Sequence, residues 1–408
     1  MQKSTGLFYL LFIFCFSSSA QSTNFLKGNV IDEATKAPIG NCSVFINSTS
    51  KGTVTNDKGE FMLQNLPEGN HELIISSIGY QTFAYDYRSA DLPLDVRVSL
   101  KQKTTELSEI TVEPEVKDGW KVWGKTFLNN FIGTTENANG CTIRNATALH
   151  FRFSQKTNRL TVFADEPLMI ENEALGYSVK YQLEDFYVDF HERLSFYLGY
   201  PLFTEMITDR NKKQKQWKKK RQEAYLGSII HFMRSLYYAQ LKKQGFELVR
   251  KMKVLNASKK KVKDMYMAYQ AADSFHIQQD GTWKRMGHDQ MISEDSVDYY
   301  HALLNKPDYF EQYKDIPEDS LMTANLDGTK SVFFTDTLYI IYTRPGDGSR
   351  QQSMIYLMTP SPVTIYSNGI YYPPQEIVTN GYWGRFGKVA NELPLDYEQT
   401  AREKNSNP

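Results

Sequence analysis

Residues 28–80 read GNVIDEATKAPIGNCSVFINSTSKGTVTNDKGEFMLQNLPEGNHELIISSIGY, and this stretch decides the fold of the first part of the chain. Apolar and polar residues alternate within short runs, as at Cys42, Val44 and Ile46. Turn-forming residues such as Asn56-Asp57-Lys58-Gly59 separate these runs at intervals of roughly ten residues. A period of two with regularly spaced turns is typical of a β-sandwich. We therefore predict a small all-β domain over residues 21–100.

The same stretch resembles the carboxypeptidase-regulatory-like domain family. The positions that carry the resemblance are Gly28-x-Val30-x-Asp32, Pro38, Gly52-Thr53, Asn56-Asp57-x-Gly59-x-Phe61, Leu66-Pro67-x-Gly69 and Ile78-Gly79-Tyr80. The resemblance implies a seven-stranded, transthyretin-like sandwich. In metallocarboxypeptidases this module is an accessory beside the zinc peptidase domain and carries no catalytic residues. The resemblance therefore implies a β-sandwich module and no peptidase activity.

The histidines agree with that expectation. A zinc peptidase needs histidine and carboxylate ligands at close spacing, with a glutamate as base. None of the seven histidines begins an HxxE or HExxH pattern. We therefore expect no catalytic residues, no metal ligands and no cofactor in this chain, and we do not expect it to be an enzyme.

The first twenty residues have the features of a secretion signal. Lys3 supplies a positive charge, and residues 7–16 form an apolar run that is too short to span a bilayer. Ser18 and Ala20 occupy the small-residue positions of a cleavage site before Gln21. A retained N-terminal anchor is the alternative. We predict export, which places the mature chain in the periplasm or at the outer membrane.

The charge balance limits the binding partners that are expected, and the cysteine content limits the disulfides that can form. Lys3 is the only charged residue of the signal, so 46 of the 47 basic residues and all 47 acidic residues remain after cleavage. This balance gives no general attraction to nucleic acid, and peripheral membrane association stays open. Cys42 and Cys141 could pair in an oxidising compartment, but the alternation around Cys42 favours a small core residue at that position.

The rest of the chain is expected to form a second domain. We predict a linker over 101–119, an α+β domain over 120–400 and a disordered tail over 401–408. Residues 107–112 resemble the L-x-E-V-x-V stretch that often follows this sandwich in receptors. The fold class expected for the whole chain is thus α+β, in which the all-β sandwich precedes a larger β-rich domain with a few helices.

Periodicity gives a coarse picture of this second domain. Helical spacing predicts helices over 120–131 and 217–244, and alternation predicts strands over 148–203 and again in the C-terminal third. The stretches that resemble a group of exported bacteroidete proteins are WGKTFLNNFIG, CTIRNATAL, ENEALGYSVKYQLEDF, AYLGSIIHFMRSLY and GYWGRFGKVANELPLDYE. In that group an uncharacterised domain follows the sandwich. The resemblance implies a shared fold and no particular activity.

The segment RNKKQKQWKKKR at 210–221 is the strongest charge feature, because eight of its twelve residues are basic. It is a candidate patch for phosphate, acidic glycan or lipopolysaccharide groups, with Trp217 adding stacking or cation–π contacts. The candidate residues are Lys212, Lys213, Lys215, Trp217, Lys218, Lys219, Lys220 and Arg221. A solvent-exposed loop and first helical turns are the alternative, and this is the usual role of a charge run.

Two further groups invite a hydrolase hypothesis. Ser228 and His231 are three residues apart on a predicted helix, on the face opposite its apolar stripe, so their side chains could meet. Asp185 and Asp189 share one face of a predicted strand near His191-Glu192. The first group lacks the G-x-S-x-G motif of a nucleophile elbow, and acidic pairs of the second kind occur by chance in any such chain.

The leading hypothesis is an exported cell-envelope protein with a non-catalytic binding or structural role. In this hypothesis the sandwich docks on an envelope protein or glycan. A hydrolase that acts on peptide or glycan through residues of the second domain is the alternative.

Overall fold

The computed structural model describes residues 24–103, 113–272, 276–277, 283–284 and 294–398. The chain divides into two compact units, Met1–Ile110 and Thr111–Pro408. The predicted signal, the stretch 107–112 and the predicted tail lie outside the described residues. Among the described residues, no helix is long and apolar enough to cross a membrane.

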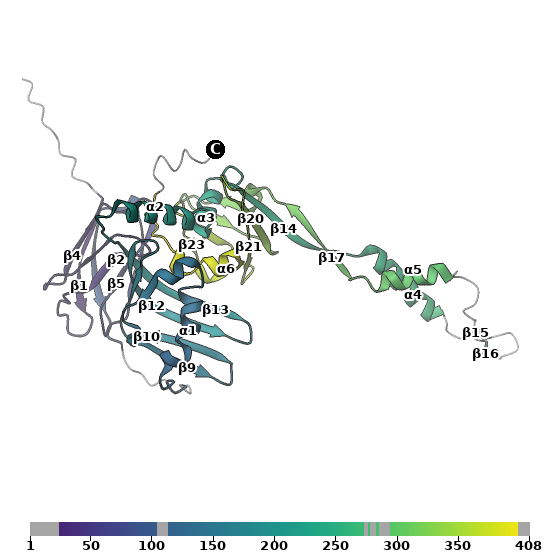
Figure 1. The fold of residues 1–408 in the computed structure, drawn as a ribbon, viewed down its shortest axis with the longest axis horizontal. Helices are drawn as coiled ribbons and strands as arrows, with labels where there is room; N and C mark the ends of the chain where they lie inside the picture. The colour runs from purple at the N-terminus through teal and green to yellow at the C-terminus, as the bar shows by residue number, and fades with distance from the viewer. Residues whose placement is uncertain (1–23, 104–112, 273–275, 278–282, 285–293, 399–408) are drawn as a thin grey trace, which may run out of the picture. The chain divides into compact units, whose positions relative to one another are not determined.

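The N-terminal unit is a seven-stranded β-sandwich, as predicted (Figure 1). Its strands are β1 (Phe25–Asp32), β2 (Ser43–Ile46), β3 (Gly52–Val54), β4 (Glu60–Gln64), β5 (Asn70–Ser76), β6 (Phe83–Arg88) and β7 (Leu94–Leu100). One sheet has the order β4-β1-β7, in which β1 and β7 run parallel, and the other has the order β3-β2-β5-β6. Alternate side chains from both sheets fill the core between them, which explains the period of two in the sequence.

Two features of the sandwich explain positions in its sequence motif. Gly59 has φ +75°, and a Cβ there would lie 2.3 Å from the carbonyl oxygen of Val30, so the β3–β4 turn requires glycine. The carboxylate of Asp32 accepts hydrogen bonds from the Thr35 backbone N–H at 2.7 Å and from the Tyr80 hydroxyl at 2.9 Å. These donors hold the pKa of Asp32 far below its usual range. Asp32 therefore ties the first strand to Tyr80, as a structural residue.

The first part of the C-terminal unit is a six-stranded antiparallel sheet with one helix packed on it. Its strands are β8 (Cys141–Ile143), β9 (Leu149–Ser154), β10 (Arg159–Ala164), β11 (Leu168–Asn172), β12 (Tyr177–Asp189) and β13 (Leu194–Glu205). Helix α1 (Gly119–Phe131) covers this sheet. The rings of Phe127 and Phe131 contact Phe151, Phe186 and Tyr181, and these aromatic contacts form the centre of the core.

The second part of this unit surrounds another core. A five-stranded sheet has the order β17-β14-β20-β21-β24, and a four-stranded sheet has the order β18-β19-β22-β23. The strands are β14 (Phe246–Leu255), β17 (Tyr309–Asp315), β18 (Met322–Ala324), β19 (Lys330–Val332), β20 (Leu338–Thr343), β21 (Arg350–Leu357), β22 (Val363–Ile365), β23 (Tyr371–Tyr372) and β24 (Ile377–Gly381). Helix α6 (Tyr382–Phe386) places Trp383 in this core beside Phe232. The predicted α+β class is confirmed, with strands more numerous than helices in both units.

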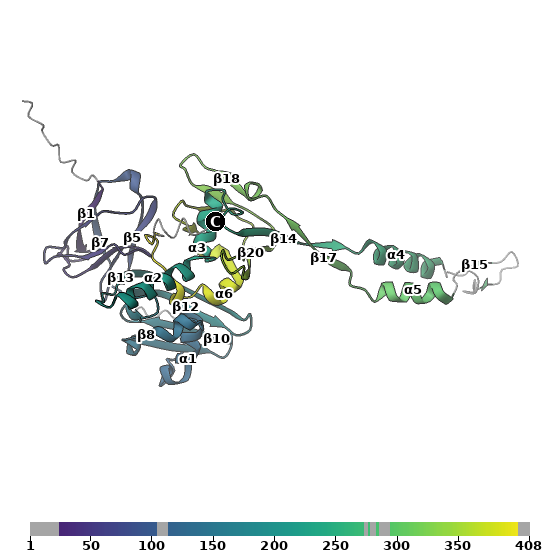
Figure 2. The same cartoon turned by 45° about the horizontal axis from the view of Figure 1, so that its top comes forward.

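Strands β14 and β17 continue past the sheet as a two-stranded ribbon, because β20 pairs with β14 only at residues 246–250. The ribbon leads to the paired helices α4 (Ala257–Ala272) and α5 (Glu294–Leu304) (Figures 1 and 2). Beyond them, β15 (His276–Ile277) pairs with β16 (Trp283–Lys284). We call the ribbon residues 251–255 and 309–314, together with α4 and α5, the arm.

The single helix predicted over 217–244 is wrong. The segment forms α2 (Asn211–Tyr225) and α3 (Ile229–Tyr237), separated by a break at Gly227, which has φ +79°. The Ser228 hydroxyl accepts a hydrogen bond from the His231 backbone N–H at 3.1 Å and caps the start of α3. The apolar periodicity that suggested one helix continues across a break that packing imposes.

Candidate functional site

Trp217 anchors the middle of the basic helix α2. Its side chain is only 5% exposed, and its indole N–H donates to the carbonyl oxygen of Glu173 at 2.8 Å. Gly176 lies against the ring so closely that a Cβ there would be 2.3 Å from it. The expectation that Trp217 stacks on a ligand is therefore wrong, because the ring is buried within its own unit.

Arg221 lies one turn further along α2 and is also buried. Its guanidinium donates to the carbonyl oxygens of Leu175 at 2.7 Å and Gly176 at 3.0 Å. It also pairs with Glu205 at 3.0 Å and stacks 3.9 Å from the centre of the Tyr177 ring. Buried arginine is stable only when its donors are satisfied. Arg221 is thus a structural anchor, and its assignment to the ligand patch is corrected.

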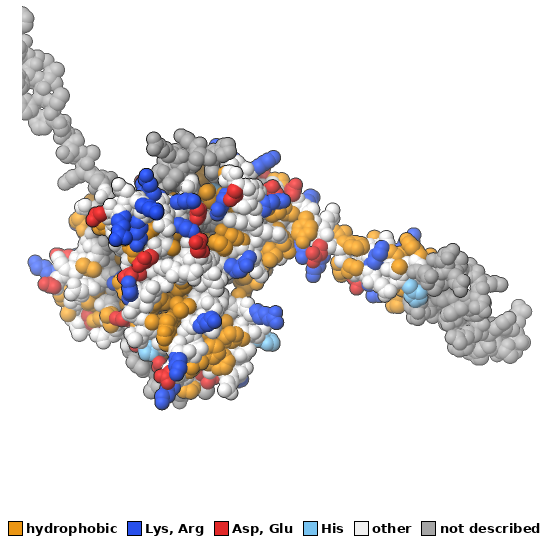
Figure 3. Space-filling model, in the orientation of Figure 1, with side chains coloured by type: hydrophobic (Ala, Val, Ile, Leu, Met, Phe, Trp, Pro, Cys, Tyr) orange, Lys and Arg blue, Asp and Glu red, His pale blue; other side chains and the backbone are white. Residues whose placement is uncertain are grey.

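The lysines of the basic segment fall into two groups. Lys213 pairs with Glu173, Lys219 pairs with Glu223, and Lys220 pairs with both Glu136 and Glu223. Lys212, Lys215 and Lys218 are exposed, and among the described residues no carboxylate pairs with them. They follow one another at three-residue spacing, so they share one side of α2. Figure 3 shows basic side chains gathered over this helix.

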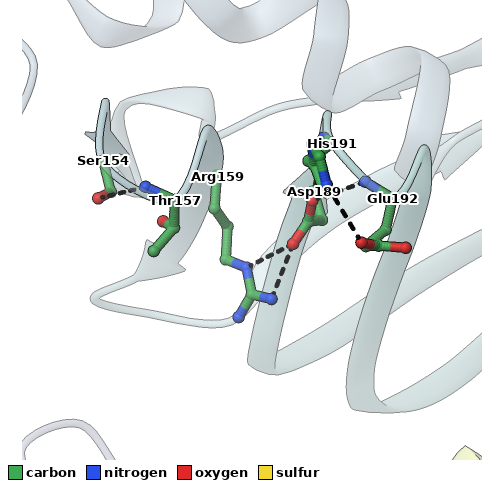
Figure 4. Close-up of polar contacts among 6 residues, drawn as sticks. All are labelled: Ser154, Thr157, Arg159, Asp189, His191 and Glu192. Carbon is green, nitrogen blue, oxygen red and sulfur yellow. Dashed lines mark hydrogen bonds and ion pairs between the residues drawn. The ribbon is translucent and has the colours of Figure 1, made fainter.

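Asp189 is the centre of the acidic group singled out in the sequence, and its role is structural (Figure 4). One carboxylate oxygen accepts the backbone N–H groups of His191 and Glu192, both at 3.0 Å, and the other accepts from Arg159 Nη2 at 2.9 Å. These backbone donors and Arg159 lower its pKa. Asp185 is exposed whereas Asp189 is buried, although both follow the register shift between Leu183 and Asp185 and β12 alternates regularly from one to the other. The spacing of four thus keeps both residues on one face of β12, but only Asp189 makes these structural contacts.

His231 is buried as well, contrary to its predicted place on the polar face of a helix. Its Nδ1 atom accepts the backbone N–H of Gly227 at 3.1 Å, so the proton is on Nε2, which lies 3.3 Å from the side-chain oxygen of Gln244. Burial lowers the pKa of His231 to about 4, and the ring is neutral at pH 7. Its contact with Ser228 is the backbone cap, which does not activate a nucleophile.

His150 lies between two carboxylates, a contact that the sequence did not suggest. Its ring nitrogens lie 2.7 Å from Glu115 and 2.6 Å from Asp165. Both partners raise the pKa of His150, Glu115 foremost, and partial burial opposes them. Because a carboxylate only accepts, both ring nitrogens donate when the imidazole is protonated. With the Val116 N–H bond to Phe151 at 2.7 Å, this contact fastens the segment before α1 to β9.

The ribbon of the arm exposes neighbouring apolar side chains on both of its faces. In the ribbon, Met252 lies opposite Gln312 and Val254 opposite Phe310, so these four side chains share one face. The other face carries Leu255 beside Tyr309 and, four residues further along β17, Tyr313, which is 54% exposed. A two-stranded ribbon cannot bury either face by itself. The arm is thus the candidate interaction surface of this unit.

An open groove of about 460 Å³ lies at the base of α4. It is lined by Leu255, Ala257, Lys260, Lys261, Asp264 and Met265. Met265 and Leu255 supply exposed apolar surface, and neither lysine is ion-paired with another described residue. Apolar side chains beside such lysines fit a partner that has both apolar and acidic groups. Figure 3 shows hydrophobic and basic side chains together along this region.

Sequence reasoning assigned no helix or strand to residues 245–331, so it missed the arm. A signal was present: β14 carries Met252, Val254 and the neighbouring Leu255, and β17 begins with Tyr309 and Phe310. Such short apolar runs resemble core strands, and periodicity cannot show that no second layer covers them.

The strands and turns of the N-terminal unit agree with those of a known domain family. Its residues 26–112 match the CarboxypepD_reg-like domain family, so the sandwich is a CarboxypepD_reg-like domain. This confirms the resemblance seen in the sequence. The match ends at residue 112 and does not include α1, α2 or the arm. Among curated proteins, no sequence matches this chain.

Two solved structures show a distant likeness. One is a Bacteroides fragilis protein described as membrane-associated and of unknown function, with 10% identity over 87% of this chain and 96% of that one, at a TM-score of 0.15. The other is a 9R-lipoxygenase from Cyanothece, with 10% identity over 54% of this chain and 49% of that one, at a TM-score of 0.16. TM-scores this low carry no inference about fold or function.

Proposed function

We propose that this chain is an exported cell-envelope protein with a non-catalytic binding role. The sandwich acts as an interaction module, and the arm contacts a second envelope component, either protein or glycan. The CarboxypepD_reg-like domain supports this role, since the family is an accessory module. The candidate hydrolase groups around Asp189 and His231 are engaged in structural contacts. This leaves the hydrolase alternative without a specific observation in its favour.

One observation carries the proposal: both faces of the ribbon expose apolar side chains. Phe310 is 46% exposed, and Met252, Val254, Leu255 and Tyr309 are also uncovered. Single exposed apolar residues are ordinary, but a continuous exposed patch marks an interaction site. The exposed lysines of the adjacent groove, Lys260 and Lys261, provide attraction to acidic groups at its rim.

The arm is tested by removing its apolar surface. In a variant with Met252, Val254, Leu255 and Met265 all changed to Gln, we expect retention of the purified chain on isolated envelopes to fall by about tenfold or more, because apolar anchors dominate interface energy. A matched variant changes four exposed apolar residues elsewhere in the same unit, namely Val122, Ile207, Leu326 and Met358, to Gln. Equal retention of the two variants would overturn the proposed role of the arm.

The free lysines of α2 form a second proposed contact, with anionic envelope polymer. Changing Lys212, Lys215 and Lys218 to Gln is expected to reduce retention at low salt, with little difference left at physiological salt, because exposed charges are screened. The control changes the ion-paired Lys213, Lys219 and Lys220 to Gln and removes the same net charge. A pull-down on isolated envelopes at two salt concentrations measures the retention of both variants. If both variants lose retention equally, net charge accounts for the effect and the patch has no specific role.

A further inference from the structure

Strand β17 is an open edge of its sheet. It is the outermost strand in the order β17-β14-β20-β21-β24, and no other described strand pairs with it. All seven of its residues are exposed. The register with β14 runs without a bulge from Val249 opposite Asp315 to Leu255 opposite Tyr309. A regular edge of this kind presents a row of unpaired backbone groups that can pair with another strand.

The usual protection of an edge strand is weak here. Proteins protect edges with proline, bulges or charged side chains, especially lysine. The sequence YFEQYKD of β17 contains no proline, its Glu311 is paired with Lys251 of β14 at 2.5 Å, and its other charges, Lys314 and Asp315, stand together at one end of the strand. No described strand pairs with the ribbon part of β14 on its other side either, but full self-pairing there would oppose Lys253 to itself. The unprotected edge is therefore that of β17.

The charges of β17 permit self-pairing over its full length in one register. Two copies related by a two-fold axis perpendicular to the sheet pair antiparallel, and opposite residues then lie on the same face. With the axis at Gln312, Phe310 opposes Lys314, Glu311 opposes Tyr313, and Tyr309 opposes Asp315. Unlike the two neighbouring registers, this register opposes no like charges.

The neighbouring registers are less favourable. An axis at Glu311 opposes that carboxylate to its own copy, and an axis at Tyr313 opposes Glu311 to Asp315. Like charges directly opposite one another destabilise a strand pair. Both shifts also shorten the overlap and leave fewer backbone groups paired. Charge and hydrogen bonding thus favour the same register.

We propose that a second copy of this chain pairs with the β17 edge, antiparallel and centred on Gln312. The two ribbons then form a continuous four-stranded sheet in the order β14-β17-β17-β14, which relieves the marginal stability of an isolated two-stranded ribbon. Met252, Val254 and Phe310 of both copies lie on one face of it. The inference rests on the proposed binding role of the arm and adds self-association to it.

The test uses the place of residue 312 on the two-fold axis. Wild-type residues 21–408 are expected to sediment as a dimer. Q312K and Q312E, which oppose two like charges, should each weaken the dimer by about tenfold or more. An equimolar mixture of Q312K and Q312E should restore it, because lysine then faces glutamate. Gln240→Lys, at an exposed position outside the arm, is the control and should leave the dimer unchanged.

Two outcomes would overturn the inference. The first is a wild-type chain that stays monomeric at all concentrations, which would leave the edge to a strand of another protein. The second is a mixture of Q312K and Q312E that is as dissociated as either variant alone. Circular dichroism checks that the variants fold. A monomer that still binds envelopes overturns self-association only, and a dimer that does not bind them overturns the proposed function only.

Discussion

Replacing Trp217 by alanine is expected to destabilise the C-terminal unit by about 3–5 kcal/mol, the usual cost of removing a buried tryptophan. The change empties the space against Gly176 and leaves the carbonyl oxygen of Glu173 without its indole donor. The helix has little support of its own, because α2 has no acidic residue in its first turn and carries a row of like charges. Burial of Trp217 and Arg221 therefore holds it in place.

Urea unfolding followed by tryptophan fluorescence measures this effect. All five tryptophans of the chain lie in the C-terminal unit, so the signal reports that unit alone. Trp217→Phe keeps most of the ring but loses the hydrogen bond, and should cost about 1–3 kcal/mol. Lys218→Ala, at the exposed neighbouring position, should stay within about 0.5 kcal/mol of wild type. A Trp217→Ala variant as stable as Lys218→Ala would show that α2 is not anchored in this way.

The second large effect is expected at the break between α2 and α3. Gly227→Ala should destabilise the same unit by about 3 kcal/mol, the sum of left-handed backbone strain and overpacking. Gly227 has φ +79°, and a Cβ there would lie 2.6 Å from the ring of the buried Tyr342. The backbone of Gly227 also donates to His231 and accepts from Trp383, so it cannot move away without breaking those bonds.

A second glycine separates the two causes. Gly328 has φ +81°, but nothing lies within 4 Å of a Cβ built on it. Gly328→Ala should therefore cost about 1–2 kcal/mol, from the backbone conformation alone. The difference between the two variants in urea unfolding measures the steric contribution at Gly227. If the two substitutions cost the same, packing against Tyr342 is not what sets the break.

The helix break also shows why local pattern misplaced the polar residues of this region. Leu226, Ile229, Ile230 and Met233 have helical spacing, so the sequence favours one helix, with His231 on its solvent side. The turn at Gly227 changes the direction of the chain and buries His231 between Tyr225 and Phe246. A glycine is tolerated inside a helix, so its presence alone does not predict a break.

The charged residues were identified correctly but could not be assigned their roles. The basic segment was evident from composition, yet two of its eight candidate residues are buried anchors and three of its lysines are neutralised by glutamates. Those glutamates include Glu136 and Glu173, which are distant in sequence. Ion pairs between distant residues depend on the tertiary fold, and a single sequence does not contain that information.

For the sandwich, the sequence was sufficient. Its strands are short, its turns carry residues such as Gly59 whose conformation is needed locally, and its alternation matches burial between two sheets. The arm shows the opposite case. The apolar residues of β14 and β17 look like core, and only the strand order shows that past Arg250 no other described strand pairs with the ribbon and that the β17 edge is open. Strand periodicity depends on neighbours in the chain, whereas exposure depends on which other layers reach that surface.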